Sequence, residues 1–533
     1  MKKIIYNTFS NSPKIKSCLN RLFLGNLDTI SGFGASAKAM LVSYIAQKYD
    51  IPVVVVSPNA VKALSFQNKL DIISEKNSVY FTQQEASPYQ EVFSDAQVLK
   101  EELETLRRFK SGQVDVLVMP AQALLNIYPD NKFYDKHSLK IELNKEYDIS
   151  KLAEKLVGIG YRRVSLVTDV GEFSARGDIL DVFPISENPV RIEFWGDQVE
   201  SIRYFDVETQ RTVEKTDLTI IEPRYKIVIE DRQEFQNLLK TAYLEHKKNI
   251  QPEFNQTLDA WFDNITTSLE TELYFEGIEY FSSFLNQGYN TIFDFLPANA
   301  LVIFDESHEV MTKLELQHKK YIDDYHQIYT EGLALPLPGL NHLDFTVLQD
   351  NFKKLKLLNL DSFIGSDDEL QGFINCSLVP RLTPGSDDFC DYITDLKNEG
   401  YKLIFTTQYP QRVQEILSNC GIDIEKPLKS GFGKKNDPQE PHFTLLKCDL
   451  TEGFVSSDLK LALVTDVEMF NRKVKKPTLA KRIARKENID YIDSINDLQI
   501  NDYVVHLTHG VGKYVGLSKQ EIDDQQKDYL TIE

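Results

Sequence analysis

The sequence TISGFGASAKA at residues 29–39 decides the fold of the amino-terminal part of the chain. A short strand-like start leads into a glycine-rich turn, and a helical pattern follows over residues 36–48. The all-β-branched run at residues 53–56 then predicts a buried parallel strand, and residues 114–119 predict another. Strands that alternate with helices in this way predict a doubly wound α/β domain. The turn after its first strand is the usual place for a phosphate group.

This turn departs from a working phosphate-binding loop of the form G-x-x-x-x-G-K-[ST]. Gly32 and Lys38 hold their places, but Ala37 stands at the second glycine and Ala39 at the hydroxyl residue. The lost hydroxyl is a direct ligand of Mg²⁺, and phosphoryl transfer depends on that metal. We therefore predict a degenerate loop that does not hydrolyse nucleotides.

An apolar strand that ends in two acids, LVIFDESH at residues 301–308, complicates this prediction. In a working nucleotide site the first acid, here Asp305, holds Mg²⁺ through water and the second, Glu306, polarises the attacking water. Because the loop cannot supply its own metal ligand, we favour the interpretation that both acids are merely retained at a strand end. Gly32, Lys38, Asp305 and Glu306 then form a degenerate nucleotide site, with no catalytic residue and no bound metal expected.

Over residues 162–223 the pattern changes to strands and tight turns. In the run VRIEFW at residues 190–195, apolar residues alternate with Arg191, Glu193 and Trp195, which places these three on the face opposite the core. A tryptophan near an arginine on a face that should be wet has the composition of a protein–protein contact. The alternative is that a neighbouring loop covers Trp195. Because the domain has lost its catalytic residues, we favour recognition and an exposed Trp195.

The bulk composition limits the class of protein. The 533 residues carry a net charge of −20, which argues against a protein that coats nucleic acid with its whole surface. The five cysteines show neither metal-ligand spacing nor pairing, so we expect no zinc site, no disulfide framework and a reducing compartment. The chain begins without a signal peptide and has no segment long enough to cross a membrane. We therefore expect a cytoplasmic protein with no membrane partner.

Changes in pattern divide the chain into five parts. They are a discontinuous α/β domain at residues 1–143 and 224–350, a β-rich insertion at 144–223, a second, smaller α/β domain of unknown role at 351–470, a basic linker at 471–492, and a β-structured segment at 493–533. A solvated linker is our interpretation of the basic run, and a phosphate-contacting patch is the alternative. Because the last residues look like the middle of a strand, we expect the chain to be a fragment of a longer protein.

The degenerate loop, residues 171–206 and the DESH sequence at residues 305–308 together resemble the bacterial transcription-repair coupling factor family (Mfd). Members of this family remove RNA polymerase stalled at DNA lesions and recruit excision repair. The resemblance implies that residues 1–350 form a module of RecA/helicase type similar to the repair subunit UvrB. It also implies that the β-rich insertion binds the repair protein UvrA. The family's docking positions fall on Arg176, Arg191 and Trp195, the last of which is commonly Phe.

The segment DYVVHLTHGVGKYVGL at residues 502–517 is similar to the start of the family's polymerase-interacting domain. That domain is a small Tudor-like β-barrel that docks on the β subunit of RNA polymerase. The resemblance implies Tyr514, Val515 and Leu517 as contacts with the polymerase. The alternative is that these three side chains form the core of the barrel.

Two departures from the family pattern bear on function. Residues 80–106 run almost directly into a helix, so we expect no aromatic hairpin of the kind with which UvrB clamps DNA. The family's motor, which should follow residue 533, is the part for which ATP, Mg²⁺ and most contacts with double-stranded DNA are expected. We therefore predict an adaptor without cofactor or enzymatic activity of its own, which links stalled RNA polymerase to UvrA. The alternative is a nucleotide-dependent, damage-binding, helicase-like module of the UvrB type.

Overall fold

The chain forms two units, Met1–Lys475 and Lys476–Glu533, and each is described by itself. The computed structural model describes residues 2–83, 96–275, 277–285, 288–339, 341–363, 372–422, 443–470, 503–506, 510–522 and 525–532. The predicted basic linker at residues 471–492 lies outside these residues, and so do residues 84–95 of the stretch in which we expected no aromatic hairpin.

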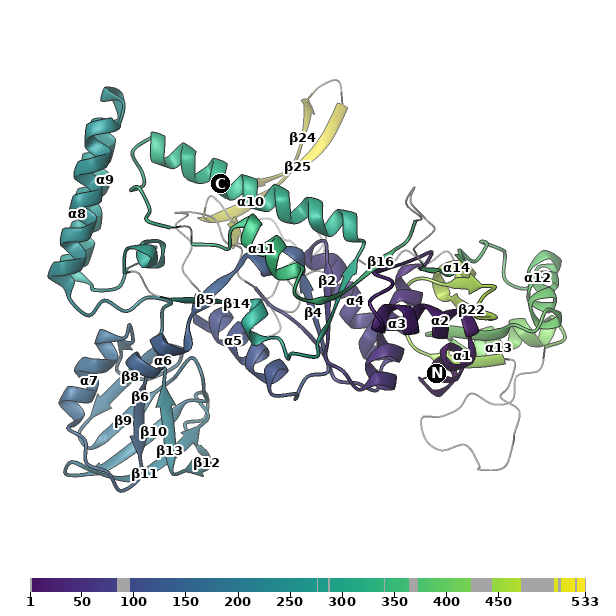
Figure 1. Ribbon diagram of the computed structural model, residues 1–533, viewed down its shortest axis with the longest axis horizontal. Helices are drawn as coiled ribbons and strands as arrows, with labels where there is room; N and C mark the ends of the chain where they lie inside the picture. Colours follow the sequence, from purple (N-terminus) through teal and green to yellow (C-terminus); the bar gives the residue numbers. More distant parts are fainter. Residues whose placement is uncertain are drawn as a thin grey trace. The chain divides into compact units, whose positions relative to one another are not determined.

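A seven-stranded parallel sheet forms the centre of the first α/β domain (Figure 1). Its strands lie in the order β17-β1-β16-β15-β2-β4-β3, and every neighbouring pair is parallel. Val53 and Val55 pack with helices α3 and α4 on one face, whereas Val54 and Val56 pack with α5, α10 and α11 on the other. The parallel sheet covered on both faces confirms the predicted α/β class. Strands β16 and β17 also belong to it, so the sheet extends past residue 350.

The helices and strands of this domain have the following bounds. They are α1 (Lys2–Asn11), α2 (Pro13–Phe23), β1 (Thr29–Ser31), α3 (Ala35–Tyr49), β2 (Val53–Ser57), α4 (Ala60–Ile73), β3 (Ser78–Tyr80), α5 (Ala96–Lys110), β4 (Val116–Pro120), η1 (Ala121–Leu125), β5 (Ile127–Pro129), α6 (Asn131–His137), α8 (Arg232–Asn249), η2 (Pro252–Phe254), α9 (Asn255–Thr271), η3 (Ile278–Leu285), β14 (Tyr289–Thr291), η4 (Ile292–Phe295), β15 (Leu301–Asp305), α10 (Ser307–Thr330), α11 (Phe345–Phe352), β16 (Lys356–Asp361) and β17 (Gly372–Phe373).

The β-rich insertion is a six-stranded sheet in the order β12-β11-β10-β9-β8-β7. All its neighbouring strands are antiparallel except β7 and β8. Helix α7 covers the apolar face of the sheet, and the antiparallel pair of strands β6 and β13 packs against the same core. The bounds are β6 (Leu139–Glu142), α7 (Ile149–Gly158), β7 (Arg162–Arg163), β8 (Glu172–Arg176), β9 (Ile179–Val182), β10 (Val190–Trp195), β11 (Gln198–Phe205), β12 (Thr212–Thr216) and β13 (Leu218–Ile221).

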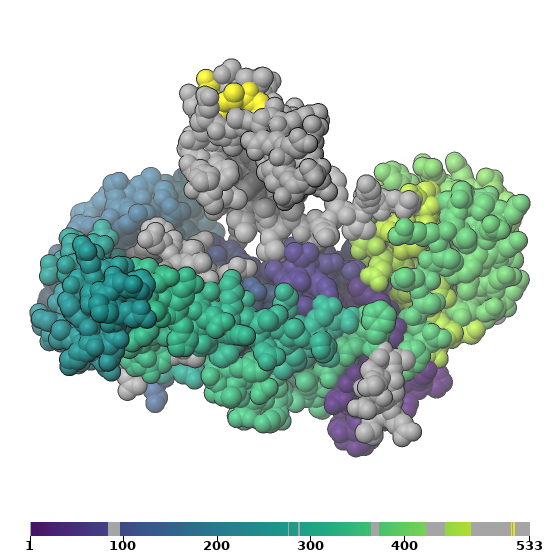
Figure 2. All heavy atoms as spheres, turned by 90° about the horizontal axis from the view of Figure 1, so that it is seen from above, coloured from purple at the N-terminus to yellow at the C-terminus, as the bar shows by residue number. Residues whose placement is uncertain are grey.

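The second α/β domain has its own five-stranded sheet, in the order β18-β21-β22-β19-β20. Several of its apolar residues nevertheless belong to the core around α1, α2 and α3; they are Ile404, Leu450, Phe454, Leu459, Leu461 and Leu463. In Figure 2 this green domain accordingly lies against the purple amino-terminal residues. The bounds are β18 (Cys376–Ser377), α12 (Asp387–Asn398), β19 (Lys402–Thr407), α13 (Pro410–Asn419), β20 (Phe443–Lys447), β21 (Phe454–Ser456), β22 (Leu461–Thr465) and α14 (Asp466–Phe470).

A disulfide corrects the expectation that the cysteines are unpaired. Cys390 of α12 is bonded to Cys420 at the end of α13, and their Cα atoms are 5.1 Å apart. The two residues are 30 positions apart in the sequence, and both pack against the core of the second α/β domain. Sequence spacing gave no sign of this pair because tertiary packing of two helices brings the residues together.

The second unit is a three-stranded antiparallel sheet in the order β23-β24-β25. The bounds are β23 (Tyr503–His506), β24 (Gly510–Ile522) and β25 (Gln525–Ile532). Within the described ranges of both units, no helix is long and apolar enough to cross a membrane. The same residues contain no group of three or more His, Cys, Asp or Glu side chains that could hold a metal ion.

A histidine pair lies where α10 meets the segment before α11. Nδ1 of His318 lies 2.9 Å from Nε2 of His342, so one ring donates a hydrogen bond to the other. The ring centroids of Tyr321 and His342 are 3.8 Å apart, and His342 is only 5% exposed. Burial, and to a smaller extent the charge of His318, lower the pKa of His342 from 6.5 to about 4. The folded protein therefore favours the neutral ring.

Acid is expected to destabilise the first α/β domain through His342. Because the pKa is lower in the folded than in the unfolded state, the stabilisation is complete above pH 6.5 and is lost as the pH falls toward 4. By linkage the loss between pH 8 and pH 5 is about 2 kcal/mol. Urea unfolding at both pH values should show this loss in the native chain and a smaller one in His342→Gln. The control is His326→Gln, on the exposed side of α10, and an equal loss in all three proteins would contradict the assignment.

Candidate functional site

Lys38 and the two acids meet in the interior, at the carboxyl ends of parallel strands. Lys38 lies in the first turns of α3 and is 1% exposed. Its Nζ atom donates to Oδ1 of Asp305 at 2.9 Å and to Oε1 of Glu306 at 2.5 Å. Asp305 also accepts from Ser57 at 3.1 Å, and Glu306 accepts from the amide of Ser362 at 3.1 Å. The structure thus brings the predicted residues together, but as ion pairs with one another.

Charge pairing shifts the pKa values of Lys38 and Glu306 toward their ionised forms. Burial disfavours the ammonium form of Lys38, but the attraction of Asp305 and Glu306 outweighs it, so the pKa of Lys38 is raised. For Glu306, burial raises the pKa, but the contacts with Lys38 and Ser362 outweigh it and the net pKa is lowered. The charge that a phosphate-binding loop offers to phosphates is therefore already neutralised by the domain's own carboxylates.

Backbone and side chains of other segments fill the space around the glycines of the loop. Gly32 has a φ of +94°, and a Cβ atom there would lie 2.1 Å from the carbonyl oxygen of Ile374. At Gly34, a Cβ atom would lie 2.8 Å from Oε1 of Glu452. Gly32 is thus required both by its backbone conformation and by close packing. The loop therefore contacts two segments that lie far along the chain, at Ile374 and at Glu452.

On the polar face of the insertion, two arginines converge on one buried acid. Asp181 of β9 is 1% exposed. Its carboxylate accepts two hydrogen bonds from Arg191, at 2.6 and 2.9 Å, and one from Arg176 at 3.2 Å. Arg191 also donates to Gln210 at 2.9 Å and lies over the ring of Phe205. The side chain of Arg191 is 17% exposed, so most of its binding capacity is used within the domain.

Trp195 lies on the same face and is open to solvent. The strand alternates as predicted, with Val190, Ile192 and Phe194 buried and Trp195 79% exposed. The exposure agrees with the expected position of the indole in solvent and leaves no covering loop among the described residues. The side chain of Arg176 is 53% exposed, in contrast to Arg191.

Sequence reasoning missed Asp181, Ser362 and Glu452. Asp181 stands directly opposite Arg191 in the antiparallel pair β9–β10, so strand pairing was a signal that could have found it. Ser362 follows β16, whose place beside β15 sets it next to Glu306. Glu452 lies 417 residues from the amide that it contacts, and no motif surrounds it.

Comparison with known proteins gives family matches in the insertion and in the second unit. Residues 139–226 match the family described as UvrB interaction domain, and residues 498–533 match the CarD-like/TRCF RID domain. Transcription-repair-coupling factors match almost the whole chain. The factor of Staphylococcus haemolyticus is 25% identical over 544 residues, which cover all of this chain and 45% of the relative. Those of Bacillus subtilis and Staphylococcus aureus strain USA300 are also 25% identical, over 99% and 97% of the chain and over 45% and 44% of the relatives.

The chain is similar to the amino-terminal part of transcription-repair-coupling factors. It spans less than half the length of these relatives. Arg176, Arg191 and Trp195 lie within the residues that match the UvrB interaction domain.

In the CarD-like/TRCF RID match, the structure describes one of the three predicted contact side chains. Val515 is 41% exposed and lies at a register shift of β24, between Tyr514 and Gly516. Gly516 has a φ of +141°, which favours glycine at this irregularity. The side chains of Tyr514 and Leu517 lie outside the described part of the chain. The side chain of Val515 therefore lies on the surface of this β-sheet.

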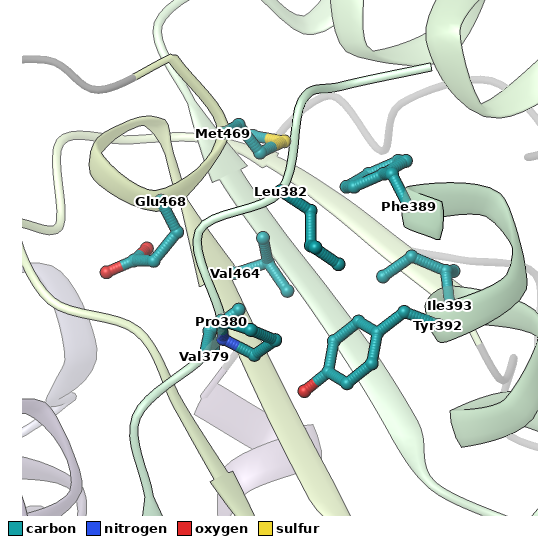
Figure 3. A pocket seen from close by; sticks show the side chains of 9 residues that line it. All are labelled: Val379, Pro380, Leu382, Phe389, Tyr392, Ile393, Val464, Glu468 and Met469. Carbon is teal, nitrogen blue, oxygen red and sulfur yellow. The ribbon is translucent and has the colours of Figure 1, made fainter. Parts of the chain in front are cut away.

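A small pocket in the second α/β domain is apolar and nearly full (Figure 3). Its lining residues are Val379, Pro380, Leu382, Phe389, Tyr392, Ile393, Val464, Glu468 and Met469. The interior has room for roughly one water molecule. The carboxylate of Glu468, its one acid, already accepts from the amides of Gly453 and Thr465, each at 2.9 Å. These contacts assign Glu468 to the support of the neighbouring loop and strand.

Proposed function

We propose that the chain is the partner-binding part of a transcription-repair coupling factor, which links a stalled RNA polymerase to the excision-repair protein UvrA. The observation that carries the proposal is the open polar face of the insertion, which bears Trp195, 79% exposed, and two arginines. A large aromatic side chain left in solvent on a face that also carries guanidinium groups is typical of an interface anchor. The match to the UvrB interaction domain supports UvrA as the partner.

Within this face, the three predicted docking residues have different roles. Trp195 and Arg176 are exposed, so we assign them to direct contact with UvrA. Arg191 is paired with Asp181 and Gln210, so we assign it to positioning the face. Asp181 is the group on which both arginines depend.

The second unit supports the other half of the proposed link. Its match to the CarD-like/TRCF RID domain favours the β subunit of RNA polymerase as the partner. Val515, which is exposed at an irregularity of β24, is our candidate contact. Tyr514 and Leu517 remain candidates from the family resemblance. In this proposal, the ATP-driven motor, its Mg²⁺ and most contacts with double-stranded DNA lie in the part of the relatives that the chain does not match.

The alternative function, a nucleotide-dependent and damage-binding module, requires a loop that can take phosphate groups. The pairing of Lys38 with Asp305 and Glu306 supports an inert loop instead, because binding a nucleotide would first have to break two buried ion pairs. A binding assay with ATP and Mg²⁺ distinguishes the two functions. Micromolar affinity that Lys38→Ala abolishes would contradict the proposal and support the alternative.

The central test is the affinity of the chain for UvrA after Trp195→Ala. We expect the dissociation constant, measured by calorimetry, to rise about 30-fold, which corresponds to about 2 kcal/mol. The melting temperature should stay the same because the indole is exposed. The matched control is Leu24→Ala, which removes another exposed apolar side chain, 75% exposed after α2. Equal affinities of the native chain and Trp195→Ala would refute this docking face.

A further inference from the structure

A carboxylate from the second α/β domain lies where α3 begins. Gly34 is the N-cap of α3 and offers no side chain to the free amides of the first turn. The amide of Ala35 instead donates to Oε1 of Glu452, at 3.3 Å. Because a Cβ atom at position 34 would lie 2.8 Å from the same oxygen, glycine lets the acid approach. The N-terminus of α3 therefore has an internal anion as its ligand.

The surroundings of Glu452 are those that a phosphate group would meet. In doubly wound domains, phosphate oxygens bind the first-turn amides of the helix after the first strand. Lys69 of α4 is buried, and its Nζ atom donates to Oγ of Ser65 at 3.3 Å. Burial lowers the pKa of Lys69, and the charges of Glu452 and Asp305 partly oppose that shift. A helix N-terminus and a buried ammonium group thus interact with one carboxylate.

The loop that carries Glu452 is fixed by its own domain. It connects β20 to β21, and the next amide along, that of Gly453, donates to Glu468 at 2.9 Å. Glu468 projects from α14, as Figure 3 shows. Two residues before Glu452, Leu450 is buried in the core that both α/β domains share. Packing on both sides therefore holds the acid at the start of α3.

A second acid of the same domain ties it to the amino-terminal helices. Asp458 accepts from Nζ of Lys14 at 2.7 Å and from the amide of Asn375 at 2.7 Å. Its carbonyl oxygen lies 3.5 Å from the hydroxyl of Ser12, the N-cap of α2. Two acids from one short stretch of the second α/β domain thus lie at the N-terminal ends of two helices of the first.

We propose that Glu452 is a built-in anion that takes the place of a phosphate group at the start of α3. The second α/β domain holds Glu452 there and so closes the degenerate loop to phosphate groups from solution. This assigns a role to a domain for which neither its sequence pattern nor its small pocket gives one. The role depends on contacts within the chain and is independent of whether UvrA docks on the insertion.

Chemical rescue tests this role. In Glu452→Ala, we expect the amides of residues 30–40 to exchange with deuterium about tenfold faster than in the native chain, as judged by mass spectrometry of that peptide. Excess inorganic phosphate should restore most of the protection, because it occupies the vacated place at the helix terminus. Potassium chloride at the same ionic strength should not, and neither salt should change exchange in the native chain.

The matched control is Glu399→Ala, which removes an exposed carboxylate from the same domain at the end of α12. Its exchange over residues 30–40 should equal that of the native chain. Faster exchange in Glu452→Ala that phosphate does not reverse would overturn the proposal, since the acid would then be a packing contact only. Equal exchange in the two variants would overturn it as well.

Discussion

Replacing Lys38 by methionine is expected to destabilise the first α/β domain by about 3–5 kcal/mol. Methionine fills a similar volume, so the loss arises from charge and not from a cavity. The substitution leaves Asp305 and Glu306 next to each other without the lysine that both of them pair with, and Asp305 is 7% exposed. Urea unfolding at neutral pH measures the effect. In a functioning nucleotide site the same lysine would face the ligand, and its loss would affect binding and leave stability nearly unchanged.

Two further variants isolate the charge effect of Lys38. Lys62→Met makes the same substitution on α4, where the lysine pairs with Glu309 on the surface, and should cost at most about 1 kcal/mol. In the triple variant Lys38→Met, Asp305→Asn, Glu306→Gln, most of the lost stability should return because no charge is left unpaired. A loss below 1 kcal/mol in Lys38→Met alone would show that the buried ion pairs are not what the loop depends on.

The sequence predicted where the loop residues lie but not what they bind. Lys38 and Asp305 meet because parallel strands end at one edge of the sheet, and the apolar runs at residues 53–56 and 301–305 placed those strands. The structure pairs the lysine with the acids and fills part of the space that a phosphate would occupy. Glu452 takes part of that space, and its position depends on a second domain folding against the first. The sequence pattern around the loop contains no information about how the second domain packs against the first.

Domain boundaries were less predictable than strands for a similar reason. Strand β16 lies beyond residue 350 but pairs with β1 and β15 of the first sheet. An all-apolar or alternating run identifies a strand, but which sheet it joins is decided by long-range pairing. The bond between Cys390 and Cys420 also depends on how two distant helices pack.

On the insertion, alternation along β10 predicted the exposed face, yet it could not show which residue organises it. The period-two pattern correctly separated Trp195 from the buried Phe194. The family resemblance gave Arg191 and Arg176 the same status, whereas the structure shows one arginine mostly buried and the other mostly exposed. The difference arises from Asp181, to which Arg191 donates twice.

Asp181→Ala is expected to destabilise the insertion by about 3 kcal/mol. The value lies at the low end for breaking a buried ion pair because Arg191 keeps its contact with Gln210 and some access to water. If the face binds UvrA, the affinity should also fall, although Asp181 is 1% exposed and cannot touch a partner. Unfolding in urea and calorimetry with UvrA measure the two effects separately.

The neighbouring Asp178→Ala provides the matched control, since Asp178 lies in the exposed turn between β8 and β9 and carries the same charge. It should change stability by less than about 0.5 kcal/mol. Asp181→Asn should lie between the two, because the amide oxygen can still accept from Arg191 but supplies no charge. If Asp181→Ala lowered stability and left UvrA affinity intact, the arginines would serve the fold alone, and Trp195 would remain as the anchor of the proposed docking face.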